Sequence, residues 1–274
     1  MRDITLGQYF PGDSMLHRTD PRAKLIALVL FITVTFVANS AGAFLLIIFV
    51  TAALMASTGI PLRVFLRGMK PLLFIIIFTT VINVLMTGGN TLLFELGFIH
   101  IYKEGILNAV LVVLRLSLLI LGSGIFLTYT TSPISMTDGL ETLLAPLGRL
   151  HIPIHEFSMM MTIALRFIPT LVEETDKIMS AQKARGADFS SGGLLARAKA
   201  LLPVLIPLFV SAFKRADELA VAMECRCYRG GEGRTRMKIL KYEAHDIVFL
   251  ITGAVLVGAV IAVNIKLPLY SLKR

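Results

Sequence analysis

The chain has 274 residues, of which 55% are hydrophobic and 16% are charged, and its formal net charge is +9. This composition is too apolar for a soluble globular domain and predicts an all-α integral membrane protein rather than a soluble enzyme. The basic charge favours contact with the anionic cytoplasmic face of a lipid bilayer or with an acidic partner. Nucleic acid is disfavoured as a partner, because the basic residues are interleaved with acids and long apolar runs.

The N-terminal segment 1–24 is polar and rich in turn residues, including Pro11, Gly12 and Pro21. A cleavable signal peptide would have an apolar stretch there, so we expect none and expect the first membrane span to direct insertion. The two cysteines, Cys225 and Cys227, are separated by one residue and are too few for a disulfide framework. We expect both to be reduced thiols in the cytoplasm.

Five apolar runs predict membrane-spanning helices. In chain order they cover residues 25–38, 43–57, 71–87, 105–130 and 247–263. The first run is short for a helix that crosses a membrane at right angles. A turn at 39–42 separates the first two runs, and a basic connector at 60–70 precedes the third. Arg115 is the one charged residue within the five runs.

The distribution of lysine and arginine predicts the orientation of these spans. Basic residues precede the first run and follow the second, whereas the loop after the third run has only Lys103. By the positive-inside rule, the N-terminus and the segment 131–246 are therefore cytoplasmic. Five spans leave the C-terminus outside with Lys266, Lys273 and Arg274, which conflicts locally with that rule.

The chain is thus expected to have four parts in a multi-pass protein of the cell membrane. These are a cytoplasmic N-terminal segment, a membrane domain of about four spans, a cytoplasmic region of long amphipathic helices, and a last span with its tail. Their bounds are 1–24, 25–131, 132–245 and 246–274.

The cytoplasmic region is predicted to be helical. Ser132 followed by Pro133 is typical of a helix start, and apolar spacing predicts two long helices at 155–185, with a kink at Pro169, and at 201–227. Gly186 is predicted to end the first of them. Both helices are apolar in their first half and charged in their second. We therefore expect each to begin against the membrane domain and to end exposed to a soluble partner.

A weak internal repeat relates the charged ends of the two long helices. Offset by 41 positions, Asp176 aligns with Asp217 and Arg185 with Arg226, along with two further pairs. The match is short enough to arise by chance. If it is a true repeat, the chain presents two similar helix ends to two similar partners.

Residues typical of catalysis or metal binding are sparse. The five histidines are scattered, His151 and His155 straddle Pro153, and Cys225-x-Cys227 lacks a second pair of ligands. No glycine cluster follows a predicted strand, so we expect no phosphate loop and no ATPase activity. We therefore predict no catalytic residue, no metal and no cofactor.

Three arginines have both a structural and a functional interpretation. Arg115 is either a buried cation bonded to carbonyl groups between helices, which we favour, or a contact to a partner membrane subunit. Arg185 and Arg226, at the ends of the two long helices, either complement the helix dipoles or insert their planar guanidinium groups into grooves of a soluble partner.

Several motifs are distributed along nearly the whole chain. The N-terminal ones are Gly7-Gln8-Tyr9-x-Pro11-Gly12-Asp13-Ser14 and Leu16-His17-x-x-Asp20-Pro21-Arg22-x-Lys24-Leu25. The central ones are Thr130-Thr131-x-Pro133 and Gly139-Leu140-Glu141. Two short motifs of the form any-Arg-any follow, Ala184-Arg185-Gly186 and Cys225-Arg226-Cys227.

Together these motifs resemble the transmembrane T component of energy-coupling factor transporters, the vitamin and metal importers of prokaryotes. The second any-Arg-any motif departs from the commoner Ala-Arg-Gly form. The resemblance implies that two cytoplasmic ATPase subunits dock at these two motifs. It also implies that the membrane domain holds a membrane substrate-binding subunit, and that movement of the ATPases is passed to it through the two long helices.

Two alternatives from other classes stay open on the sequence. One is an integral membrane enzyme that modifies lipids, and the other is a stand-alone secondary carrier. The lack of a charged pair within the spans disfavours the carrier. Because the resemblance assigns substrate choice to another chain, this sequence does not name the transported nutrient.

Overall fold

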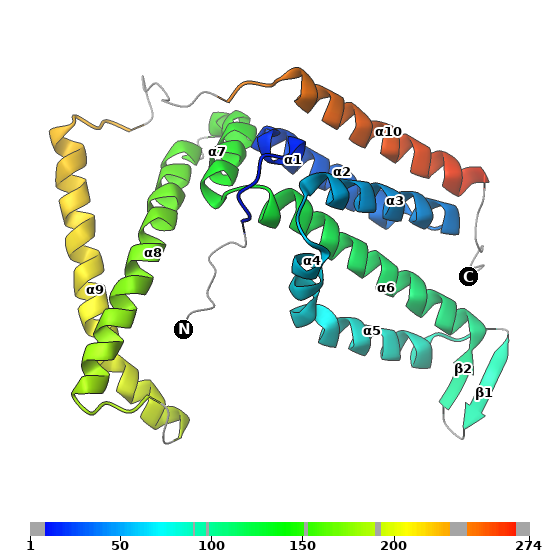
Figure 1. Cartoon of the computed structure of the whole chain (residues 1–274), viewed down its shortest axis with the longest axis horizontal. Helices are drawn as coiled ribbons and strands as arrows, with labels where there is room; N and C mark the ends of the chain where they lie inside the picture. The colour runs from blue at the N-terminus through cyan, green and yellow to red at the C-terminus, as the bar shows by residue number, and fades with distance from the viewer. Residues whose placement is uncertain are drawn as a thin grey trace. The chain divides into compact units, whose positions relative to one another are not determined.

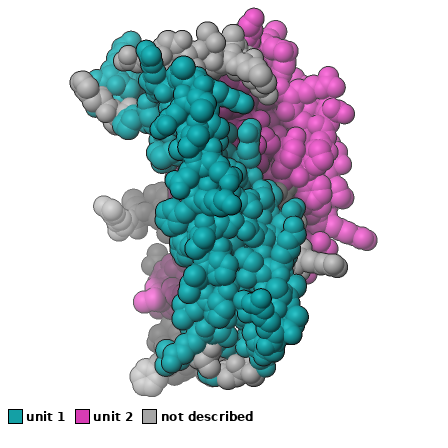
Figure 2. Space-filling view, turned by 90° about the vertical axis from the view of Figure 1, so that its left-hand side faces the viewer, with its two compact units in different colours: residues 1–6, 141–239 teal, residues 7–140, 240–274 magenta. Residues whose placement is uncertain are grey.

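The computed structural model describes residues 9–89, 91–96, 99–150, 153–189, 193–230 and 240–266. The chain forms two compact units, shown in different colours in Figure 2. Unit 1 comprises Met1–Leu6 and Glu141–Ile239, and unit 2 comprises Gly7–Leu140 and Leu240–Arg274. Apart from one β-hairpin, the regular elements of the described residues are helices, which confirms the predicted all-α class.

Unit 2 is a bundle of apolar helices with one hairpin (Figure 1). Its elements are α1 (Met15–Arg18), α2 (Pro21–Val37), α3 (Ala41–Thr58), α4 (Leu62–Met69), η1 (Lys70–Leu72), α5 (Leu73–Met86), β1 (Leu92–Leu96), β2 (Ile99–Tyr102), α6 (Lys103–Ser123), the π-helical turn η2 (Gly124–Tyr129), α7 (Pro133–Leu144) and α10 (Ala244–Lys266).

Local sequence explains where α2 and α3 begin and end. The carboxylate of Asp20 accepts a hydrogen bond from the Arg22 amide, and Pro21 occupies the first turn of α2. The hydroxyl of Ser40 caps α3 through the Ala43 amide, and Gly59, at φ 68°, ends it in the left-handed conformation. The predicted turn at 39–42 is therefore the junction of these two helices.

The core of unit 2 is centred on α2, which packs against α10 and α6, and α3 packs against the same two helices. The ring of Phe31 lies 5.8 Å from that of Phe126, which in turn lies 6.1 Å from that of Phe249 on α10. Gly122 of α6 faces Phe31 so closely that a side chain there would overlap the ring. The glycine thus allows α6 to approach α2.

Four helical segments are long and apolar enough to span a membrane. They are Ala41–Thr58, Leu62–Met86, Lys103–Tyr129 and Ala244–Lys266. They match four of the five predicted runs, while α2 has 17 residues and corresponds to the run that looked short. The protein is therefore a helical membrane protein.

Two segments between the spans have regular structure that the sequence analysis did not predict. The basic connector at 60–70 is largely helical, because α4 begins directly after Pro61 and continues through η1 into α5. The loop after the third span contains the antiparallel hairpin β1–β2, in which Leu96 pairs with Ile99. Its β-branched and aromatic residues favour strands, although the segment is too short to show clear alternation.

Unit 1 contains the end of α7, the 3₁₀ helix η3 (Ala145–Leu150), α8 (Ile154–Ala184) and α9 (Leu194–Cys225). The predicted helix at 155–185 matches α8, which continues past Pro169. The helix predicted at 201–227 begins earlier, and α9 continues past Pro203 and Pro207. The expected connector at 190–193 lies mostly outside the described residues.

The helices α8 and α9 pack against each other within unit 1 (Figure 1). A guanidinium nitrogen of Arg215 on α9 lies 2.6 Å from a carboxylate oxygen of Glu174 on α8. In the figure, the end of α8 lies near the start of α9, and the end of α9 lies at the opposite end of the pair. The carboxyl ends of these two helices therefore lie at opposite ends of the pair.

Candidate functional site

The first any-Arg-any motif forms the end of α8. Arg185 is the C-cap residue, and Gly186 follows it with φ at 88°. The Gly186 amide donates to the Lys183 carbonyl at 3.0 Å, and the Ala187 amide donates to the Gln182 carbonyl at 3.0 Å. These two bonds define a Schellman motif, which satisfies the last carbonyl groups of the helix.

The second motif ends α9 with the same geometry. Arg226 is the C-cap residue, and Cys227 follows it with φ at 55°. The Cys227 amide donates to the Glu224 carbonyl at 2.8 Å, and the Tyr228 amide donates to the Met223 carbonyl at 3.1 Å. Both arginines thus occupy the same position of the same helix-ending motif.

All six residues of the two motifs are exposed. Among the residues that the structure describes, the guanidinium groups of Arg185 and Arg226 have no ion-pair or hydrogen-bond partner. Each arginine backbone is therefore held rigidly by the helix end, while its five N–H donors are available to another molecule.

A second polar cluster lies in unit 2 and joins three segments that are distant in sequence. The ammonium group of Lys24, 2% exposed, donates to the Thr130 carbonyl at 2.8 Å and to the Thr131 hydroxyl at 3.1 Å. The carboxylate of Asp246 accepts from the Asp20 amide at 2.8 Å and from the Glu243 amide at 2.8 Å. We call this group, with Arg22, the buried cluster.

Arg22 completes the buried cluster. Its Nη2 and Nε atoms lie 2.8 and 3.0 Å from the two carboxylate oxygens of Asp20, and its guanidinium carbon lies 4.1 Å from the centre of the Tyr242 ring. The hydrogen bond to Asp20 raises the pKa of Arg22. Burial lowers the pKa of Lys24, just before the first apolar run, to about 8, although Asp246 and Asp20 oppose that change.

The buried cluster fixes the place where α7 begins. The two threonines that bind Lys24 directly precede Ser132 and α7, and the Ser132 hydroxyl accepts from the Ser135 amide at 3.2 Å. Further along α7, a side chain at Gly139 would lie 2.8 Å from Pro21. The motifs around Asp20 and Thr130, far apart in sequence, therefore meet in one structure.

Arg115 of α6 lies apart from this cluster. Its Nη2 donates to the Ala38 carbonyl at 2.7 Å and reaches the Asn39 side-chain oxygen at 3.4 Å. Its guanidinium carbon lies 5.7 Å from the centre of the Phe44 ring. The expected bond to a carbonyl group between helices is present.

The sequence analysis missed two residues at the buried cluster, and some residues that it named lie outside the described part of the chain. Asp246 and Tyr242 had no role in the sequence interpretation, since their partners are about 220 residues away and no local pattern marks them. Gly7, Gln8 and His151 lie outside the described residues. Within the described part of the chain, no three His, Cys, Asp or Glu residues are grouped as metal ligands would be.

The fold and these sites define a class of protein, a helical membrane protein whose long helix pair ends in two equivalent exposed arginines. The family model described as CbiQ, a cobalt transport protein, matches residues 12–237, and the chain belongs to this family. The resemblance to the T component is confirmed by curated relatives named energy-coupling factor transporter transmembrane protein EcfT.

These relatives match nearly end to end. The one from Ruminiclostridium cellulolyticum is 53% identical over 257 residues, which are 94% of this chain and 95% of the relative. The one from Clostridium kluyveri is 50% identical over 94% of this chain and 95% of the relative. The one from Bacillus subtilis is 47% identical over 93% of this chain and 96% of the relative.

Proposed function

We propose that this chain is the non-catalytic scaffold of an energy-coupling factor importer for a vitamin or another micronutrient. In this role it links two cytoplasmic ATPase subunits to a membrane substrate-binding subunit. The observation that carries the proposal is the equivalence of the two helix ends, where Arg185 and Arg226 cap α8 and α9 through the same hydrogen bonds.

Each arginine is suited to dock one ATPase subunit. A guanidinium group stays charged at any physiological pH and presents its donors in a planar fork, which matches carboxylate and carbonyl groups in a groove. The Schellman motif fixes the helix end, so little backbone entropy is lost on docking. The docking residues are Ala184, Arg185 and Gly186 on α8 and Cys225, Arg226 and Cys227 on α9.

The apolar surface of the helix pair supports contact with the membrane-embedded partner. Large apolar side chains are exposed in the middle of α9, among them Ile206, Phe209 and Phe213 at 62%, 61% and 69%. On α8, Met160 and Met161 are also exposed. Contiguous exposed apolar surface marks a protein or membrane interface, and flexible methionines adapt to different partners.

The proposed topology follows from charge. We assign the N-terminus and unit 1 to the cytoplasm of a cell whose plasma membrane holds unit 2, because basic residues flank the predicted cytoplasmic ends of the spans. Unit 1 then corresponds to the coupling region and unit 2 to the membrane domain with the last span. Arg115 lies in the membrane domain, where its bond to the Ala38 carbonyl fits the structural interpretation that we favoured over a contact to the substrate-binding subunit.

Charge reversal tests the docking role. In the assembled transporter, the double variant Arg185→Glu, Arg226→Glu should lose ATPase subunits on purification and lose ATP-driven uptake. Either single change should be partly tolerated, because the other helix end and the membrane domain still bind. The matched control is Lys177→Glu, Lys214→Glu, which makes the same charge change at exposed positions of α8 and α9. Normal uptake by the arginine double variant would exclude this docking role.

Thiol chemistry separates the two docking sites. The exposed Cys225 and Cys227 should cross-link to one ATPase subunit through a short reagent. In a background that lacks both native thiols, Ala184→Cys should capture the other subunit. If the two ATPase subunits are different chains, capture of the same chain at both sites would contradict the assignment of one subunit to each motif. The isolated chain should neither hydrolyse ATP nor transport, whereas the alternative enzyme or carrier would be active alone.

A further inference from the structure

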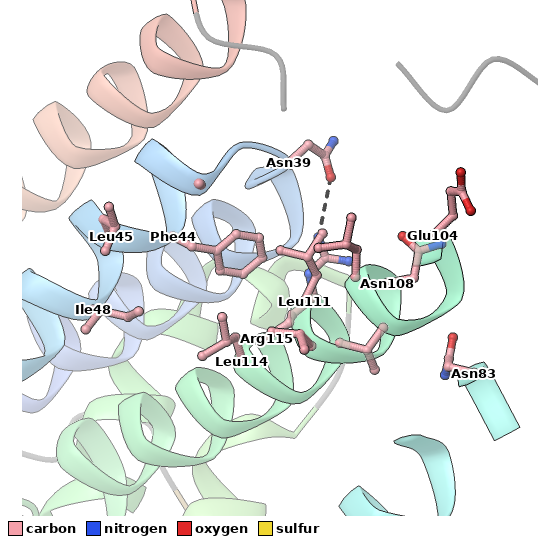
Figure 3. A pocket seen from close by; sticks show the side chains of 14 residues that line it. Asn39, Phe44, Leu45, Ile48, Asn83, Glu104, Asn108, Leu111, Leu114 and Arg115 are labelled. Carbon is pink, nitrogen blue, oxygen red and sulfur yellow. Dashed lines mark hydrogen bonds between the residues drawn. The ribbon is translucent and has the colours of Figure 1, made fainter. Parts of the chain in front are cut away.

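A cavity of about 710 Å³ lies in unit 2, between the start of α3 and the first half of α6 (Figure 3). Its apolar wall includes Phe44, Leu45 and Ile48 of α3 and Leu111 and Leu114 of α6. Leu45 is 66% exposed, so this wall is open at its edge. Because α3 and α6 both have the length and hydropathy of membrane spans, we expect the opening to face lipid chains.

The cavity also has a polar side along α6. Glu104, Asn108, Leu111 and Arg115 follow one another at helical spacing, so they line one face of the helix. In Figure 3 Asn39 lies above Arg115 and is joined to it by a hydrogen bond. The cavity is therefore amphipathic, with a cation at one point of a largely apolar wall.

The cation is not fully satisfied by its own chain. Nη2 of Arg115 has the Ala38 carbonyl and the Asn39 side chain as acceptors. Its Nε is buried and has no hydrogen-bond partner among the described residues. The guanidinium group as a whole lines the cavity and stays charged, so an anion in the cavity would gain charge-assisted hydrogen bonds from it.

The acidic residue of the cavity lies at its other end. The carboxylate of Glu104 is hydrogen-bonded to the Thr91 hydroxyl at 2.9 Å. Its position, eleven residues before Arg115 on α6, corresponds to roughly 16 Å along a helix. At this distance the carboxylate of Glu104 does not neutralise Arg115, whose positive charge is therefore available to an anion.

We propose that this cavity binds one anionic phospholipid, with the phosphate at Arg115 and Asn39 and an acyl chain along Leu45, Ile48 and Leu114. The charge complements that of the arginine, and the apolar wall continues into the bilayer. Cavities of roughly 300 to 1,000 Å³ suit small amphiphiles, whereas a partner helix about 10 Å wide lies along a face instead. This lipid site does not depend on the docking role of the two helix ends.

The full-length protein in detergent provides the test. The protein is stripped of lipid, exposed to equal amounts of phosphatidylglycerol and phosphatidylcholine with the same acyl chains, and analysed by native mass spectrometry. We expect one retained phosphatidylglycerol per chain and little phosphatidylcholine. Arg115→Gln should lower this retention by about tenfold, because charge-assisted hydrogen bonds are lost. The matched control is Arg63→Gln, at an exposed arginine of α4, which should retain the lipid as before.

A second variant tests the proposal in case Arg115→Gln fails to fold. Leu45→Trp leaves Arg115 and its hydrogen bonds unchanged but fills the open edge of the cavity, so it should also lose the lipid. Equal retention by the unmodified protein and both variants overturns the proposal, as does equal retention of the two lipids. Displacement of phosphatidylglycerol by millimolar inorganic phosphate would indicate a simple anion site instead.

A photo-cross-linking side chain at position 45 distinguishes a lipid from a protein in native membranes. Covalent attachment of an anionic phospholipid is expected. Attachment only to another protein would show that a partner, rather than a lipid, occupies the cavity, and would overturn the proposal.

Discussion

Gly186 and Cys227 adopt the same left-handed backbone conformation, with φ at 88° and 55°, one residue after the two candidate docking arginines. A residue with a side chain is less stable than glycine in this conformation by about 1 kcal/mol, because its Cβ crowds the following carbonyl. The commoner Ala-Arg-Gly form of the motif thus has a physical reason, and Cys227 departs from it at an energetic cost.

Two substitutions at these positions should have opposite effects on stability. Cys227→Gly should raise the free energy of unfolding by about 1 kcal/mol, and Gly186→Ala should lower it by a similar amount. At Gly186 no atom lies within 4 Å of an added Cβ, so the loss comes from backbone conformation alone. Thermal melting of the full chain in detergent measures both. Gly148→Ala, which also has open space but no positive φ, is the control; a loss there equal to that of Gly186→Ala would contradict the explanation.

Lys24 should make stability depend on pH in the alkaline range. Its pKa of about 8 in the folded protein is below the ordinary 10.5, so the unfolded chain binds more protons between these values. Raising the pH through this interval therefore favours the folded state. From pH 7 to 10, the unmodified protein should gain stability relative to Lys24→Met. The same comparison with Lys70→Met, at an exposed lysine, should show no such difference.

Lys24→Met should also lower stability at every pH, by about 1 to 3 kcal/mol, because the Thr130 carbonyl and the Thr131 hydroxyl lose their donor. The melting temperature in detergent reports this loss. An unchanged melting temperature at pH 7 would show that the buried cluster does not hold the start of α7.

Gly122→Val should weaken the packing of α6 on α2. The new Cβ would overlap the ring of Phe31, and such overpacking costs about 1 to 3 kcal/mol. Gly258→Val in α10 is the matched control, since no atom lies within 4 Å of an added Cβ there. A lower melting temperature is expected for the first variant only, and equal melting of the two would refute the close approach.

The proposed topology can be checked with single cysteines in a background free of Cys225 and Cys227. Gly88→Cys, after α5, should react with a membrane-impermeant thiol reagent in whole cells, because it is expected outside. Gly148→Cys in η3 should react only after the membrane is permeabilised. The reverse pattern would invert the orientation drawn from the distribution of lysine and arginine.

Much of the fold could be predicted because membrane helices have a strong sequence signal. The apolar runs at 105–130 and 247–263 agree with α6, η2 and α10 to within a few residues. The end of α8 at Gly186 was also predictable and is confirmed, since glycine commonly follows a helix cap. The start of α9 at Leu194 was missed because Arg197 and Lys199 interrupt the apolar pattern of its first turns, although these residues form helices readily.

The sites were less predictable, for reasons that differ between them. The left-handed conformation of Cys227 has no sequence signal, because non-glycine residues seldom adopt it. The buried cluster joins Asp20 to Asp246, and a contact across more than 200 residues leaves no local pattern. The role of Arg115 depends on the shape of a cavity, which apolar periodicity does not describe.

The contact between α8 and α9 has a consequence for movement. Val204 is the one buried side chain among those described on α9, and the ion pair between Arg215 and Glu174 is partly exposed. Exposed ion pairs contribute about 0 to 1 kcal/mol, close to thermal energy. We therefore expect the crossing angle of the two helices to change at little energetic cost, while the Schellman motifs keep each end rigid. Each helix would then move as a rigid body about this contact.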